Sequence, residues 1–220
     1  MMTIDMTIQP YSSVEDLAQG VANLVVQSAK KAIDERGVFH WALAGGTSPK
    51  LCYECLSDAA IDWQKVHVWF GDERCLPVGD VERNDDMADQ ALLNHVSIPE
   101  SNIHRIHAEW EAQKAAQQYC DELSLIPCLD LVLLGMGEDG HTASLFPNNP
   151  ALLSEDLAVA VYHSPKPPSD RVSMGYKTLK AARQRVMMVT GEGKRDVFEK
   201  LCSGGDFPIS IDNSDWHTTL

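Results

Sequence analysis

A largely apolar run from Leu129 to Leu134 leads directly into a glycine-rich turn, and this junction constrains the fold more than any other stretch of the chain. The turn carries Asp139 and His141, separated by one glycine. An open α/β sheet builds its ligand sites in this way, with a buried strand that ends in glycine-rich backbone and polar side chains at the carboxyl edge. The stretch therefore predicts a strand followed by a candidate site.

Segments with strand-like and helix-like patterns alternate along the chain. The expected strands are residues 3–9, 38–44, 66–70, 103–106, 129–134, 158–162 and 186–189. The expected helices run from Ser13 to Gly37, from Pro49 onward, over 85–95, 110–124 and 177–183, and from 191–194 to about Cys202. This alternation predicts a single α/β domain over residues 1–220, with a mostly parallel, Rossmann-like open sheet and helices on both faces. The tail from Phe207 is expected to be irregular, with at most one edge strand.

Charge and cysteine usage limit the classes of partner. The formal charge is −14, whereas nucleic acids and anionic membranes require a basic face, so neither is expected as a partner. No apolar run approaches the length of a bilayer span, and six scattered cysteines favour a reducing compartment, so we expect a cytoplasmic protein. Cys52 and Cys55 form a C-x-x-C pair, but Pro49 already opens that helix, which favours two ordinary helical cysteines over a redox or metal pair.

Three of the expected strands end in glycine-containing polar turns, after Ala44, Phe70 and Leu134. The carboxyl ends of parallel strands lie at one edge of the sheet, so these three turns should converge there. Convergence of the turns is the main reason to expect a functional site.

The turn after Ala44 contains Gly45, Gly46 and Thr47. It has two interpretations of similar weight. One is an ordinary capped turn from a strand into a helix. The other is a phosphate cradle, because two glycines let backbone N–H groups approach an anion and a helix N-terminus favours negative charge.

His141 is the candidate general base. A lone histidine is more often structural, but this one lies in an expected site turn with Asp139 beside it and Asp72 at a neighbouring strand end. The glycines around it formally satisfy G-x-G-x-x-G. The next strand, however, lacks the acidic residue that a dinucleotide site needs, so the glycines are better explained as placing His141.

Arg74, Arg171 and Lys194 are the natural countercharges for a phosphate in an otherwise acidic protein. Each of them alone is a weak signal, because most lysines and arginines are solvated surface charges.

At these residues the sequence resembles the 6-phosphogluconolactonase family, within the wider group that includes glucosamine-6-phosphate deaminase. The matching blocks are ALAGGTSP (42–49), WFGDERCLP (69–77) with Asn84-Asp85, LVLLGMGEDGHTASLFP (131–147), Arg171-Val172 and VTGEGK (189–194). The deaminases share the Asp-Gly-His of the third block but usually continue with an Ile-Ala-Phe-Asn-Glu-Pro-like run. They also tend to have Asp-Glu-Tyr where this chain has Asp-Glu-Arg.

The resemblance implies metal-free hydrolysis of 6-phospho-D-glucono-1,5-lactone in the pentose phosphate pathway. We expect no cofactor and a monomer. It implies that His141 is the base that activates water and that Asp72 orients or electrostatically supports it. Substrate and phosphate binding would fall to Gly45, Gly46, Thr47, Arg74, Asp139, Arg171 and Lys194.

Two features depart from the family pattern. Ser173 stands where the family usually has threonine, and residues 174–177 are less family-like. The apolar strand that usually closes the family's chains is expected to be altered here, because only four residues follow Trp216. Two other functions stay open: a sugar-phosphate isomerase or deaminase with Asp72 as carbon-acid base, and a sugar-phosphate sensor without catalysis.

Overall fold

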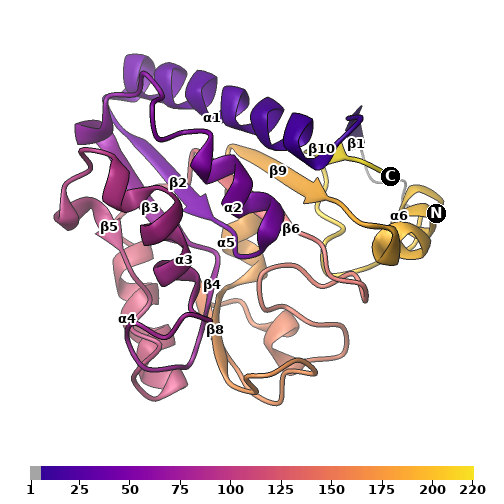
Figure 1. Cartoon of the computed structure of the whole chain (residues 1–220). Helices are drawn as coiled ribbons and strands as arrows, with labels where there is room; N and C mark the ends of the chain where they lie inside the picture. Colours follow the sequence, from indigo (N-terminus) through magenta and orange to yellow (C-terminus); the bar gives the residue numbers. More distant parts are fainter. Residues whose placement is uncertain (1–5) are drawn as a thin grey trace.

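The computed structural model describes residues 6–220, and its centre is a seven-stranded, wholly parallel sheet (Figure 1). The strand order is β1-β10-β9-β6-β2-β3-β5. The strands are β1 (Met6–Pro10), β10 (Ser214–Thr218), β9 (Gln184–Val189), β6 (Leu131–Gly135), β2 (Phe39–Leu43), β3 (Val66–Phe70) and β5 (Ile103–His104). The α/β fold with a mostly parallel sheet is therefore confirmed. The expected first strand, 3–9, falls partly outside the described residues.

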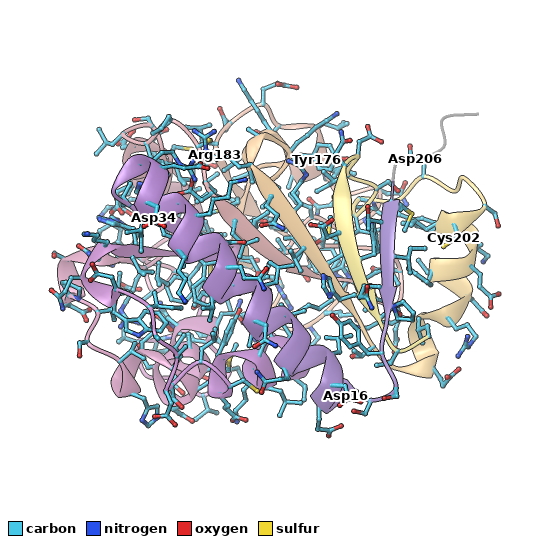
Figure 2. All side chains as sticks on the ribbon, turned by 90° about the horizontal axis from the view of Figure 1, so that it is seen from above. Asp16, Asp34, Tyr176, Arg183, Cys202 and Asp206 are labelled. Atoms are coloured by element: carbon cyan, nitrogen blue, oxygen red, sulfur yellow. The ribbon has the colours of Figure 1, made fainter. Side chains whose placement is uncertain are left out.

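Helices cover both faces of this sheet. The α-helices of the described residues are α1 (Val14–Arg36), α2 (Thr47–Glu54), α3 (Asn84–Ala91), α4 (Ala112–Leu123), α5 (Tyr176–Ala181) and α6 (Arg195–Cys202). The long α1 crosses one face (Figure 2). On the opposite face Phe198 of α6 lies 6.0 Å from the ring of Trp216 in β10. Within residues 6–220 no helix is both long and apolar enough to span a membrane.

The ends of α1 follow directly from the sequence. The hydroxyl of Ser13 accepts a hydrogen bond from the N–H of Asp16 at 3.0 Å, which satisfies one of the free donors of the first turn. Gly37 closes the helix at φ 79°, a left-handed conformation that glycine adopts without a Cβ penalty. Between these ends Leu17, Val21 and Val25 are fully buried, and their spacing of four residues places them on one face of the helix.

A second, three-stranded antiparallel sheet was not anticipated. It has the order β4-β8-β7 and consists of β4 (Asp72–Arg74), β8 (Arg171–Met174) and β7 (Ala158–Val161). The expected strand 158–162 therefore exists but lies outside the parallel sheet. A four-residue strand gives no periodicity that would distinguish parallel from antiparallel pairing, so the sequence could not assign its sheet.

The tail is irregular over residues 207–213, as expected, but the expectation that its one strand would lie at an edge was wrong. Strand β10 lies inside the sheet, parallel to both β1 and β9, and its residues Trp216, His217 and Thr218 are buried. The ring of His217 stacks on Tyr11 at 5.6 Å and its Nδ1 bonds the Tyr11 hydroxyl at 2.9 Å. Because four of the five residues of this strand are polar, a hydropathy pattern alone underestimates how deeply it is buried.

Three histidines gather near the amino end of the sheet. His104 stacks on Trp69 with ring centroids 3.8 Å apart, and its Nε2 lies 3.0 Å from Nδ1 of His67. The indole N–H of Trp69 donates to Nδ1 of His40 at 3.2 Å, so that nitrogen is unprotonated. Burial, with repulsion from His67, lowers the pKa of His40 from 6.5 to about 4, and burial lowers the pKa values of His67 and His104 as well.

This cluster should make the protein sensitive to acid. The folded pKa of His40 lies below the unfolded value, so its stabilising effect is complete above pH 6.5 and is lost as the pH falls toward 4. We expect urea unfolding to show a larger loss of stability between pH 7 and pH 5 for the wild type than for His40→Gln, by up to about 2 kcal/mol. Equal losses in the two proteins would exclude His40 as a source of acid sensitivity.

Candidate active site

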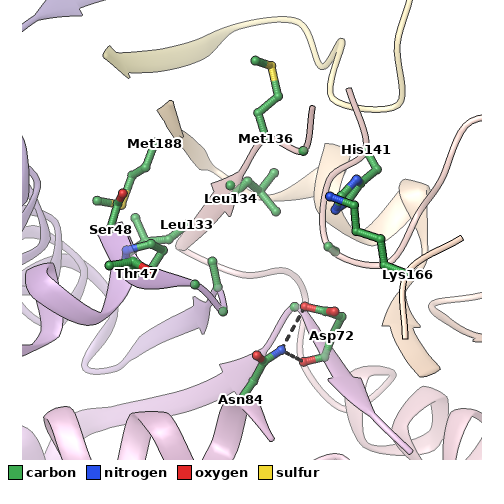
Figure 3. Close-up of a pocket in the computed structure, with 18 of the residues that line it drawn as sticks. Thr47, Ser48, Asp72, Asn84, Leu133, Leu134, Met136, His141, Lys166 and Met188 are labelled. Atoms are coloured by element: carbon green, nitrogen blue, oxygen red, sulfur yellow. Dashed lines mark hydrogen bonds between the residues drawn. The ribbon is translucent and has the colours of Figure 1, made fainter. Parts of the chain in front are cut away.

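A cavity of about 510 Å³ opens at the carboxyl edge of the parallel sheet (Figure 3). Its walls come from the turns after β2, β3 and β6, and from the segments after β7 and β9. The convergence of the three glycine-containing turns is therefore observed. The lining includes Gly45, Gly46, Thr47, Asp72, Arg74, His141, Arg171 and Lys194, which is every predicted site residue except Asp139.

His141 is held by Asp139, which does not line the cavity. Oδ1 of Asp139 lies 2.5 Å from Nδ1 of His141 and accepts the backbone N–H of the same histidine at 3.1 Å. A carboxylate only accepts, so Nδ1 carries the proton and Nε2 is left with a free lone pair. The turn can be this tight because a Cβ on Gly137 would lie 2.0 Å from Nδ1 of His141.

The environment keeps His141 largely in the neutral form. Burial lowers its pKa, and this effect outweighs the hydrogen bond and charge of Asp139, which raise it. The charge of Lys166 lowers the pKa further, and the charge of Asp72 raises it. A neutral imidazole with a free Nε2 can accept a proton from water.

Asp72 makes no hydrogen bond to His141. Its Oδ2 accepts from the hydroxyl of Ser144 at 2.6 Å. Its Oδ1 accepts from the amide of Asn84 at 3.2 Å (Figure 3). Any influence of Asp72 on His141 is therefore electrostatic, and the orienting hydrogen bond comes from Asp139. The sequence could not decide this, because both carboxylates were available.

Glu73 fixes the segment that carries Asp72 and Arg74. It is almost completely buried and accepts backbone N–H groups of Arg74, Asn84 and Asp85 at 2.7–2.8 Å. Two of these donors begin α3, so a carboxylate from β4 caps that helix and stabilises its positive end. One buried side chain thus ties β4 to α3 beside the cavity.

The first turn of α2 lines the opposite side of the cavity. Gly45 is required there, because a Cβ would lie 2.1 Å from the side-chain oxygen of Asn84. The hydroxyls of Ser48 and Thr190 are 2.6 Å apart and join the start of α2 to the end of β9. Helix N-termini expose unpaired N–H groups, so this wall suits an anion.

Three positively charged side chains border the same wall, and they differ in the hydrogen bonds that they already make to the protein. Nη1 of Arg74 donates to the carbonyl of Glu82. The guanidinium of Arg171 donates to three carbonyls of the 166–168 segment at 3.0–3.2 Å. Lys194 is half-buried, and burial together with repulsion from Lys166 lowers its pKa. Lys194 is thus better available to a ligand than Arg171.

The departures from the family pattern leave the cavity walls intact. Ser173 accepts the N–H of Ser144 at 3.3 Å, so its hydroxyl supports the residue that bonds Asp72. None of residues 174–177 lines the cavity. The sequence did not single out Ser144 or Lys166, because an isolated serine and an isolated lysine carry no spacing signal.

Metal ligation finds no support among residues 6–220. No group of three or more His, Cys, Asp or Glu side chains in that range has the arrangement of a metal site. Cys52 is buried and Cys55 exposed, and both thiols are free.

Comparison with known proteins places the chain in a family. Residues 12–217 match the family described as glucosamine-6-phosphate isomerases/6-phosphogluconolactonase, and the chain belongs to it. It is 41% identical over 180 residues to the 6-phosphogluconolactonase of Synechocystis sp., covering 78% of this chain and 74% of that protein. The crystal structure of 6-phosphogluconolactonase from Thermotoga maritima shares the fold, with a TM-score of 0.90 at 23% identity over 97% of this chain and 99% of that one.

A longer relative contains a similar region. The human GDH/6PGL endoplasmic bifunctional protein is 38% identical over 205 residues, which is 88% of this chain. The match covers 26% of that relative, so the chain spans about a quarter of its length.

The contact between Asp139 and His141 can be tested without substrate. The hydrogen bond and charge of Asp139 raise the pKa of His141, so Asp139→Asn should lower it. NMR titration of the His141 ring protons measures this value, with the exposed Asp34→Asn as matched control. An unchanged titration in Asp139→Asn would show that this carboxylate does not set the protonation of His141.

Proposed function

We propose that the protein hydrolyses 6-phospho-D-glucono-1,5-lactone to 6-phospho-D-gluconate in the pentose phosphate pathway. The observation that carries the proposal is the unengaged Nε2 of His141, which faces a cavity whose opposite wall suits a phosphate. Membership of a family whose description includes 6-phosphogluconolactonase, and the 41% identity to a relative of that name, support it.

The reaction proceeds in two steps at His141. Nε2 takes a proton from water as the water oxygen bonds to the lactone carbonyl carbon, and the π pair moves to the carbonyl oxygen. When this intermediate collapses, the bond from the carbonyl carbon to the ring oxygen breaks, and His141 returns the proton to that oxygen. Asp139 keeps the proton of the imidazole on Nδ1 and favours the transient imidazolium.

The phosphate is assigned to the wall formed by the first turn of α2 and Lys194. Backbone N–H groups near Gly46 and Thr47 would meet its oxygens, while Lys194 and Arg74 would balance its charge. The assignment of Arg171 changes: we propose that it holds the 166–168 segment, because its Nε and Nη2 already donate to carbonyls there, while Nη1 lies 3.5 Å from the Ser144 hydroxyl.

Isomerisation or deamination of an amino-sugar phosphate is the second candidate, because the family description includes it. It needs a carboxylate that removes a proton from carbon. Asp72 lines the cavity, but its two oxygens already accept hydrogen bonds from Ser144 and Asn84, so both are engaged by the protein. Ammonia release from glucosamine 6-phosphate would favour this candidate, and binding of sugar phosphates without turnover would favour a sensor.

Cellular location and assembly belong to the same proposal. We propose a cytoplasmic monomer, consistent with the six free cysteines and with a cavity built from one chain.

Lactone hydrolysis should release acid faster than the spontaneous reaction. We expect freshly prepared 6-phosphogluconolactone to give rapid proton release with the wild type, and a kcat at least ~100-fold lower with His141→Ala. The measurement is titration at constant pH, with His95→Ala as a matched control on the surface. A wild-type rate no higher than background would refute the proposed function.

Lys194 should act mainly on substrate binding. Lys194→Met is expected to raise KM by about tenfold or more and to change kcat little, because a phosphate contact is the same in the ground and transition states. The exposed Lys200→Met is the control. A lower kcat with unchanged KM would instead place Lys194 at the reacting carbonyl.

A further inference from the structure

We propose that Lys166 is a further catalytic residue, whose ammonium group stabilises the negative charge that develops on the carbonyl oxygen of the substrate. This inference rests on the proposed function. No residue of the strand-end turns or of the sequence motifs has been assigned to stabilise this oxygen.

The position of Lys166 is fixed although its segment is exposed. Nη2 of Arg171 donates to the carbonyls of Lys166 and Pro167, at 3.2 and 3.0 Å, and Nε of Arg171 donates to the carbonyl of Pro168 at 3.2 Å. Ser164 adds two bonds, from its hydroxyl to the Lys166 carbonyl at 2.8 Å and from the Lys166 N–H to its hydroxyl at 3.2 Å. The backbone that carries the lysine is therefore held from both sides.

Arg171 is itself anchored. It is 5% exposed, and its guanidinium carbon lies 5.6 Å from the ring centroid of Phe146. The ring of Phe146 also lies beside His141, at 4.5 Å between centroids. A continuous set of contacts thus connects the base, the phenyl ring and the arginine that holds the lysine.

The side chain of Lys166 lines the cavity and extends toward His141 (Figure 3). Its charge lowers the pKa of His141 and also that of Lys194, so its ammonium is close enough to act on both. The hydrogen bonds of Lys166 to other described residues are all made by its backbone atoms. The ammonium thus remains available to a ligand that lies between the base and the phosphate-binding wall.

That location matches the chemistry of the attacked carbonyl. If Lys194 and α2 hold the phosphate and His141 holds the attacking water, the lactone carbonyl lies between them. Attack moves the carbonyl π pair onto oxygen, and a fixed positive charge there lowers the barrier, because the charge on oxygen is larger in the transition state than in the substrate. The other bordering cations are less suitable, since Arg74 and Arg171 already donate to protein carbonyls.

The test compares Lys166→Met and Lys166→Arg with the remote, exposed Lys30→Met. We expect Lys166→Met to lower kcat by about 10- to 100-fold and Lys166→Arg to restore most of that loss. In substrate-free protein, NMR titration should show a higher pKa for His141 in Lys166→Met, because a repelling charge has been removed. The acid limb of the kcat/KM profile should move to higher pH with it.

The possible outcomes separate this inference from the proposed function. A rise in KM alone, with kcat and the His141 titration unchanged, would make Lys166 a binding residue and overturn the proposal. Full activity of Lys166→Met would overturn it as well, while leaving lactone hydrolysis in place. Failure of the wild type to hydrolyse the lactone would refute the proposed function, and the substrate-free titration would still report whether Lys166 acts on His141.

Discussion

The hydrogen bond between Asp139 and His141 is the interaction on which the account of this site depends. It fixes which nitrogen of the imidazole carries the proton and leaves the other nitrogen facing the cavity. The bond is possible only because the turn after β6 is compact, and the compactness depends on the absence of a side chain at Gly137. The placement of His141 close to its own turn therefore explains the glycine-rich sequence. A bound nucleotide is not needed to explain these glycines.

Around this pair, the two sheets contribute different segments to the site. The parallel sheet brings the turns after β2, β3 and β6 to one edge, as the strand rule requires. The small antiparallel sheet adds β4 and β8, and so presents Asp72 and Arg171 from the other side. Buried Glu73 joins this addition to α3 and thereby to Asn84. Both sheets thus support the site, although few local features of the sequence indicate that the two sheets belong together.

Much of the fold could be predicted because its signals are local. Capping at Ser13 and Gly37 and the apolar runs of the central strands specify their elements within a few residues. The pairing of β4 with β8 joins residues about a hundred positions apart, and no local pattern encodes such a contact. The same reason explains why the one strand of the tail, β10, was expected at an edge and not inside the sheet.

The residues of the site likewise fall into two groups, those that local sequence patterns predict and those that depend on contacts between distant parts of the chain. Some site residues lie at strand ends, namely His141, Asp72 and the glycines after Ala44. For these, the order of strands and helices along the chain is enough to predict that they converge. The roles of Asp139 and Arg171 depend on which partner each side chain selects, and the position of Lys166 depends on contacts made by Arg171. These are three-dimensional facts, and motif matching tends to give such residues a generic binding role.

The central claim is that neutral His141, held by Asp139, is the base for lactone hydrolysis. The most direct test compares two pKa values in the wild type: that of His141 from NMR titration of the free protein, and that of the acid limb of kcat/KM for the lactone. Since burial lowers the pKa of His141, the account predicts that both values agree and lie below the ordinary 6.5. A kinetic pKa that differs clearly from the NMR value would contradict it and assign proton transfer to another group.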